Sequence, residues 1–213
     1  MIVQIVKKDF IYLITSLKST LVVMLIFSLF MPMANMAFAC VMPALVCYLG
    51  FYSLMAYEER NKSNIFNMSL PLSRQDICLS KYIENTIFII LSSLLALIGL
   101  WIAQKSAASE IKFVEVNMLD MLISMFSTGL IYSAVMLPCI FYFGTLKARY
   151  VLMVTYIIIF ILANNVKNAA LNEIIYKVTN VFGGSLIFML LGAIIIILIS
   201  YGISQQIWAK KEF

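Results

Sequence analysis

The sequence predicts an all-α membrane protein, with six transmembrane helices after an N-terminal interfacial amphipathic helix and both termini in the cytoplasm. Composition predicts a membrane protein, because 63% of the 213 residues are hydrophobic and only 12% are charged. Soluble domains are closer to half apolar and about a quarter charged. Long uncharged runs then predict the number of spans, and the distribution of Lys and Arg predicts their orientation.

The first fourteen residues predict a helix that lies in the cytoplasmic interface. Gln4, Lys7 and Lys8 recur at helical spacing among apolar residues such as Val6 and Phe10. A helix with one polar and one apolar face suits the boundary between headgroups and acyl chains. The alternative is that residues 1–14 simply extend the first span.

Two spans are predicted between Lys18 and Glu58, where 39 consecutive residues carry no charge. One span needs about 20 residues. Pro and Asn in "MPMAN" favour a tight turn there, so the spans are placed at about 15–33 and 36–57. Pro43 predicts a kink in the second.

Four more spans follow, at about 83–103, 119–143, 150–164 and 183–204. A short basic turn, "GTLKARY", separates the fourth from the fifth. No connecting segment is long enough for a soluble domain, so residues 1–213 are expected to form a single transmembrane domain.

The basic residues predict the orientation. Fifteen Lys and Arg are present, and eleven of them fall on the side of the two termini. Cytoplasmic loops carry an excess of Lys and Arg, so this side is expected to be cytoplasmic. The four on the other side are Lys105, Lys112, Lys167 and Lys177.

Catalytic and metal sites are not predicted. The chain has no histidine, and its four cysteines are isolated, which argues against the commonest general base and against a Cys-based zinc site. The glycine-rich phosphate cradle followed by Lys is missing. Glu84 falls at the start of a span, where interfacial solvation is expected, so no charge deep in the membrane marks an ion path.

The fourth span contains more polar and small residues than the others. Such a helix is expected to face protein or a cavity rather than lipid. It is therefore a candidate pathway or dimer surface, with packing inside the chain as the alternative. The residues concerned are Ser124, Ser127, Thr128, Gly129 and Ser133.

The cytoplasmic loop 58–82 predicts ordered structure. Pro71 disfavours helix at the residue before it. Ser73 with Asp76 three residues later predicts a capped helix start that continues into the third span. The alternative is an ordinary connector whose charges only follow topology.

Within this loop, "SLPLSRQDICLSKYI" resembles the loop signature of small six-span permeases of type-two ATP-binding cassette (ABC) exporters. The resemblance extends over the chain in outline, and the most similar subgroup exports amphipathic peptides such as phenol-soluble modulins, with antimicrobial-peptide exporters nearby. It implies a permease in the bacterial cell membrane that moves amphipathic peptides or other hydrophobic compounds outward. The alternative is a non-transporting membrane scaffold or assembly protein.

The resemblance also implies partners. Two copies of an ATPase subunit would bind ATP and Mg²⁺, with no cofactor in this chain, and a second permease would complete a homo- or heterodimer. A coupling helix in the loop would dock on the ATPase. The residues so implied are Glu58, Glu59, Arg60, Asn64, Ile65, Phe66, Asn67, Leu70, Pro71 and Arg74.

Overall fold

The protein is helical throughout the part of the chain that its structure, a computed structural model, describes: residues 2–34, 36–61, 73–105, 118–165 and 186–210. Long apolar segments form helices here because a helix satisfies its own backbone hydrogen bonds, as a membrane requires. The elements are α1 (Ile2–Thr15), α2 (Lys18–Ala34), α3 (Met36–Val46), η1 (Cys47–Phe51), α4 (Tyr52–Arg60), α6 (Arg74–Lys105), α7 (Met118–Asn165) and α9 (Leu186–Lys210).

Several of these helices are long and apolar enough to cross a membrane. Four stretches in the described ranges meet this criterion, namely Phe38–Arg60, Gln75–Ala103, Met118–Ile158 and Phe188–Lys210. The pair formed by α1 and α2 is a fifth candidate if it is one broken span. A multi-helix membrane protein is therefore confirmed, while six spans with cytoplasmic termini remain a prediction.

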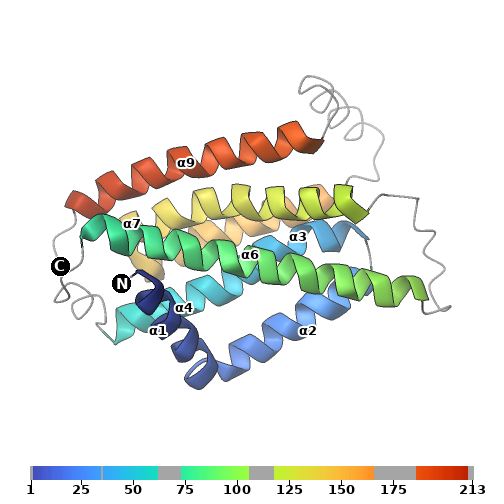
Figure 1. Ribbon diagram of the computed structural model, residues 1–213, viewed down its shortest axis with the longest axis horizontal. Coiled ribbons are helices and arrows are strands. Elements are labelled where there is room, and N and C mark those ends of the chain that lie inside the picture. The colour runs from blue at the N-terminus through green and yellow to red at the C-terminus, as the bar shows by residue number, and fades with distance from the viewer. Residues whose placement is uncertain (1, 35, 62–72, 106–117, 166–185, 211–213) are drawn as a thin grey trace.

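The N-terminal helix is separate from the helix that follows it. α1 and α2 meet at an angle of 90°, so residues 1–14 are not a straight extension of the first span. α1 packs across the end of the bundle, at the same end as the last turns of α4 and α9 and the first turn of α6 (Figure 1). This end contains the site described below.

The second predicted span is a helix with a local irregularity. α3 contains Pro43 and passes into a π-helical turn, η1, before α4 continues to Arg60. Pro43 has no backbone N–H to donate to the helix. The π-helical turn that follows one turn later is a change in the backbone hydrogen-bond register of the same helix. The structure thus has a π-helical turn after Pro43, while the kink predicted at Pro43 stays a prediction.

The fourth and fifth predicted spans form one element, α7, that breaks at Gly144. This residue has φ +75°, a conformation that glycine adopts without steric cost. The predicted turn "GTLKARY" is thereby corrected, because helix resumes at Thr145 and only Gly144 departs from it.

The helices pack closely inside and leave apolar side chains outside. α2 and α6 approach each other closely at Gly99, where a Cβ atom would overlap the carbonyl oxygen of Leu29. On the outer face of α9, Leu198 and Ile199 are 62% and 59% exposed. An apolar surface of this kind fits a helix that faces lipid.

Candidate functional site

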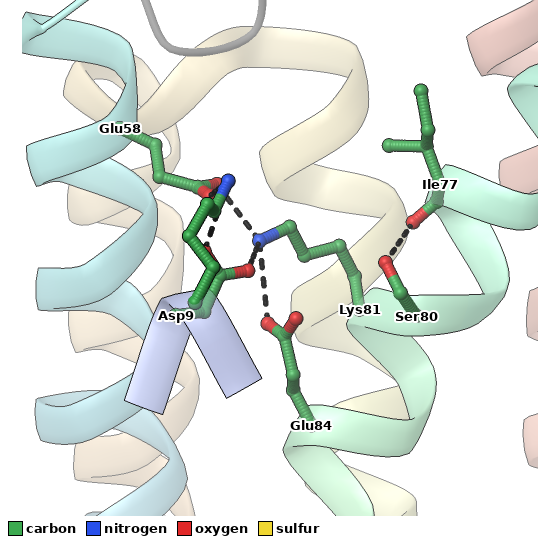
Figure 2. A network of polar contacts seen from close by, with 7 residues as sticks. Asp9, Glu58, Ile77, Ser80, Lys81 and Glu84 are labelled. Atoms are coloured by element: carbon green, nitrogen blue, oxygen red, sulfur yellow. Dashed lines mark hydrogen bonds and ion pairs between the residues drawn. The ribbon is translucent and has the colours of Figure 1, made fainter. Parts of the chain in front are cut away.

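Five charged side chains form one cluster where α1, α4 and α6 meet, and Figure 2 shows its centre. The members of this ion cluster are Lys8, Asp9, Glu58, Lys81 and Glu84. Four of them are almost completely buried, with side chains no more than 2% exposed, and Lys8 is 23% exposed. Buried charges persist in proteins only when they are paired, so these residues specify how the three helices meet.

Lys81 lies at the centre of the cluster. Its Nζ atom is 2.6 Å from Asp9 Oδ2, 2.8 Å from Glu58 Oε2 and 3.2 Å from Glu84 Oε2. Each contact joins α6 to another element or to its own next turn (Figure 2). One ammonium group with three donors is thus shared among three carboxylates.

Lys8 closes the exposed side of the cluster. Its Nζ atom lies 3.2 Å from Asp9 Oδ1 and 3.5 Å from Glu58 Oε1. It also lies 5.7 Å from the centroid of the Tyr12 ring, a favourable cation–π distance. Asp9 and Glu58 therefore each contact both lysines.

The environment of Asp9 favours its charged form. Burial by itself raises the pKa of this carboxyl, but the nearby Lys81 ammonium and hydrogen bonds from neighbouring side chains lower the pKa from 3.8 to about 2. The ionised carboxylate is therefore the form that holds α1 against α6.

Glu59 makes a second connection, to the break in α7. Its Oε2 atom accepts a hydrogen bond of 2.8 Å from the backbone N–H of Thr145 and another from the Thr145 hydroxyl. The first N–H groups of a helix have no partner within it, and a carboxylate there also meets the positive end of the helix dipole. Glu59 thus caps the second half of α7 from a different helix.

Tyr57 makes a third connection, to the bend between α1 and α2. Its hydroxyl donates a hydrogen bond of 3.1 Å to Ser16 Oγ. Its ring lies 5.8 Å from the ring of Tyr12. Tyr57, Glu58 and Glu59 are consecutive, yet they contact the α1–α2 bend, the ion cluster and the α7 break respectively. We call these three residues the anchor triplet.

This arrangement is suited to transmitting movement between helices. Within the described residues no group of three or more possible protein ligands is arranged for a metal ion, and Lys81 occupies the position between the three carboxylates. Glu58 and Glu59, in the last turn of α4, contact side chains or backbone of α1, α6 and α7. Paired side chains that join rigid helices are a physical route for such coupling.

The loop that follows the anchor triplet enters α6 through the predicted cap. Ser73 N–H donates to Asp76 Oδ2 at 3.2 Å, and Asp76 N–H donates to Ser73 Oγ at 3.1 Å. This is the reciprocal geometry of a capping box. The prediction of a capped helix start at Ser73 is confirmed.

Three of the residues implied for ATPase coupling lie in the last turn of α4. Glu58 is buried in the ion cluster and Glu59 contacts Thr145, so both bind groups within the chain, while Arg60 is exposed. Arg74 begins α6, and its side chain lies outside the described part. The remaining residues also lie outside it: Asn64, Ile65, Phe66, Asn67, Leu70 and Pro71.

The polar residues of the fourth predicted span pack inside the chain. Thr128 donates a hydrogen bond to the carbonyl of Cys40, and Ser124 Oγ lies 3.5 Å from Cys40 Sγ. A Cβ atom at Gly129 would lie 2.9 Å from Ile89 and 3.0 Å from Pro43. Ser127 and Ser133 are fully buried. These contacts fit internal packing, while a pathway or dimer surface at these residues stays a prediction.

Sequence reasoning missed Asp9, Lys81 and Glu84 as members of the site. Glu84 was expected to be solvated at the start of a span, but it is 1% exposed and paired with Lys81. The spacing of Lys81 and Glu84, three residues apart, is a local signal for a pair on one helix face. A lysine close to an apolar span is also a sequence signal for a functional site.

One comparison with known proteins finds a match. Residues 4–209 match the model of a family described as ABC-2 family transporter protein. No curated protein and no solved structure matches the chain. Together with its apolar helices, the family match over nearly the whole length shows that the chain belongs to the ABC-2 family of transporter proteins, as a multi-pass membrane permease component that works with an ABC ATPase.

Proposed function

We propose that this chain is the permease of an ATP-driven exporter, and that the anchor triplet passes movement of the cytoplasmic loop to the transmembrane helices. The observation that carries the proposal is the position of Tyr57, Glu58 and Glu59. They lie two residues before loop residues 62–72 and contact three different parts of the bundle.

The loop itself is the proposed docking site for the ATPase. In this proposal Ile65 and Phe66 are apolar anchors, and Arg60 and Arg74 contribute polar contacts. ATP and Mg²⁺ are bound by two ATPase subunits, and a second permease chain completes the transporter. Glu58 and Glu59 act on the permease side of this contact, because their carboxylates already bind groups within the chain.

The proposed cargo is an amphipathic peptide, such as an antimicrobial peptide, or another hydrophobic compound that leaves a bacterial cell. Two features support this class. The loop sequence resembles that of peptide exporter permeases, and the described charges lie in α1, in the ion cluster, near the helix ends or just after the break at Gly144. A bundle that is apolar along its length suits cargo that enters from the lipid.

Co-purification with the ATPase tests the docking site. Phe66→Asp introduces a carboxylate into a contact proposed to be apolar, and an unpaired buried carboxylate is costly. We expect this variant to insert into membranes normally but to lose the ATPase on affinity purification. Lys147→Asp is the control, because it changes an exposed residue of α7 and should retain the ATPase.

Co-purification tests the docking site, and a separate efflux measurement distinguishes export from a scaffold role. If Phe66→Asp retains the ATPase, the docking assignment is wrong. If the wild-type transporter hydrolyses ATP but no peptide efflux depends on it in inverted vesicles or cells, the exporter proposal is wrong and a scaffold role is favoured.

A further inference from the structure

An apolar groove lies in the angle between α1 and α2, with α6 as its floor. Its volume is about 360 Å³, within the range of small-molecule sites. The residues that matter for the argument are Phe10 and Ile14 from α1, Leu21 and Leu25 from α2, and Phe88 and Leu91 from α6. Ile14, Leu25 and Leu91 are 56%, 40% and 47% exposed, so the groove opens on the outer surface of the bundle.

The described residues that line the groove offer a ligand no charged group and no free hydroxyl donor. Ser28 and Ser92 belong to it, but their hydroxyls donate to the carbonyls of Leu25 and Ile89 within their own helices, each at 3.0 Å. The part of a ligand inside the groove is therefore expected to be a hydrocarbon chain.

Two exposed lysines are placed beside this groove. Lys7 precedes Phe10 by three residues on α1, and Lys18 precedes Leu21 by three residues on α2. Residues three apart on a helix are neighbours on one face. Neither lysine forms an ion pair with a described residue, so both ammonium groups are available to an anion.

We propose that this groove binds an anionic phospholipid of the surrounding leaflet. One acyl chain lies in the groove, and the headgroup is held by Lys7 and Lys18. An apolar slot with two cations beside it complements this ligand in both shape and charge, and basic residues at a membrane surface attract anionic lipids. A cationic amphipathic peptide lacks that complementarity.

A lipid in this position would support the ion cluster. Phe10 adjoins Asp9 in the chain and stacks on Phe88, with ring centroids 5.5 Å apart. An acyl chain filling the groove packs against both rings and holds α1 against α6. The proposal stands independently of the exporter function, because it concerns the permease chain and the bilayer alone.

Lipid binding to the purified full-length permease tests this proposal. Native mass spectrometry in mild detergent would compare phosphatidylglycerol with phosphatidylcholine that carries the same acyl chains. The variants are the double substitution Lys7→Gln/Lys18→Gln, the groove-filling Leu25→Trp, and Lys147→Gln as a control at another exposed lysine.

We expect the wild type to prefer phosphatidylglycerol. The double variant should lose roughly thirty-fold in affinity for it, about five-fold for each lysine, with phosphatidylcholine binding unchanged. Leu25→Trp should weaken the binding of both lipids, and Lys147→Gln should match the wild type. Circular dichroism checks that each variant is folded. If Leu25→Trp does not fold, the surface lysine variants alone test the proposal.

Three results would overturn the proposal. Equal affinity for the two lipids in the wild type indicates only general solvation by lipid. Unchanged phosphatidylglycerol binding in the lysine double variant removes the headgroup site. Unchanged lipid binding in folded Leu25→Trp, with loss of bound cationic amphipathic peptide instead, assigns the groove to cargo.

Discussion

Lys81 Nζ lies 2.6 Å from Asp9 Oδ2, although the two residues are 72 positions apart in the chain. This contact joins the N-terminal helix α1 to the first turns of α6, and both atoms are shielded from solvent. The structure therefore depends on a charged pair in a region where apolar packing alone would be the simpler solution. Buried pairs of this type are costly to break because the remaining charge stays buried.

Loss of Lys81 should destabilise the permease strongly. Lys81→Met keeps the apolar stem but removes the ammonium group that Asp9, Glu58 and Glu84 share. Removing one partner of a buried ion pair costs about 3–5 kcal/mol. We expect a large fall in the thermal midpoint of the detergent-solubilised protein.

The matched control for Lys81 is Lys147→Met. Lys147 is an exposed lysine, and surface substitutions usually change stability by less than about 0.5 kcal/mol. If Lys81→Met and Lys147→Met have the same thermal midpoint, the ion cluster does not stabilise the fold.

The double variant Asp9→Asn/Lys81→Met should lose less stability than the sum of the losses in the two single variants, because it removes charges of both signs.

The lowered pKa of Asp9 predicts that the folded protein loses stability in acid. Its pKa is lowered in the folded protein, from 3.8 to about 2, so folding is favoured by the ionised form. This contribution is fully present above pH 3.8 and is lost as the pH falls toward 2. Its size is about 2 kcal/mol, from the shift and the free energy of one pKa unit.

Thermal unfolding between pH 5 and pH 2 checks the contribution of Asp9. Asp9→Asn should be less stable than the wild type at pH 5, and the gap between the two proteins should narrow as the pH falls. A gap that stays constant over this range would show that ionisation of Asp9 does not contribute to folding.

Local and long-range features of this protein differ in how far the sequence predicts them. The cap formed by Ser73 and Asp76 was predicted and found because its hydrogen bonds join residues three apart. The irregularity after Pro43 is predictable for the same reason, since a missing N–H acts within its own helix. Both features depend on chemistry within one turn.

The ion cluster and the short α7 break depend on contacts between distant segments. The sequence places Asp9 in the N-terminal helix and places Glu58 and Lys81 at opposite ends of the loop 58–82, but nothing local shows that these segments meet. The turn after the fourth span was expected to occupy seven residues. Helix resumes directly after Gly144 because Glu59, 86 positions away from Thr145, caps its first N–H groups.

Removal of the Glu59 carboxylate should uncouple α4 from α7. Glu59→Ala loses both hydrogen bonds to Thr145, and loss of a helix cap costs about 1 kcal/mol. On the proposed function, the variant should keep its ATPase but show reduced peptide efflux per ATP hydrolysed. Vesicles with a coupled ATP assay measure both quantities.

Glu59→Gln is the conservative partner of that variant. The amide can still accept a hydrogen bond from Thr145 but lacks the charge that favours a helix N-terminus. Efflux per ATP should therefore lie between the values for Glu59→Ala and the wild type. Wild-type coupling in Glu59→Ala would show that the contact between Glu59 and Thr145 does not transmit movement.

The close approach of α2 and α6 should make Gly99 intolerant of any side chain. In Gly99→Ala the new methyl group would overlap the carbonyl oxygen of Leu29 and lie 3.2 Å from its carbonyl carbon. Backbone atoms of a packed helix cannot move aside as a flexible side chain can, and overpacking typically costs about 1–3 kcal/mol. We expect a lower thermal midpoint for this variant.

Gly192→Ala is the control for the same substitution in another helix. A Cβ atom at Gly192 meets no heavy atom of the described residues within 4 Å, and alanine favours helix over glycine by about 1 kcal/mol. The thermal midpoint of Gly192→Ala should therefore equal or exceed that of the wild type. If Gly99→Ala is as stable as Gly192→Ala, the two helices can separate at Gly99 without cost, and close packing there does not fix the position of α2 against α6.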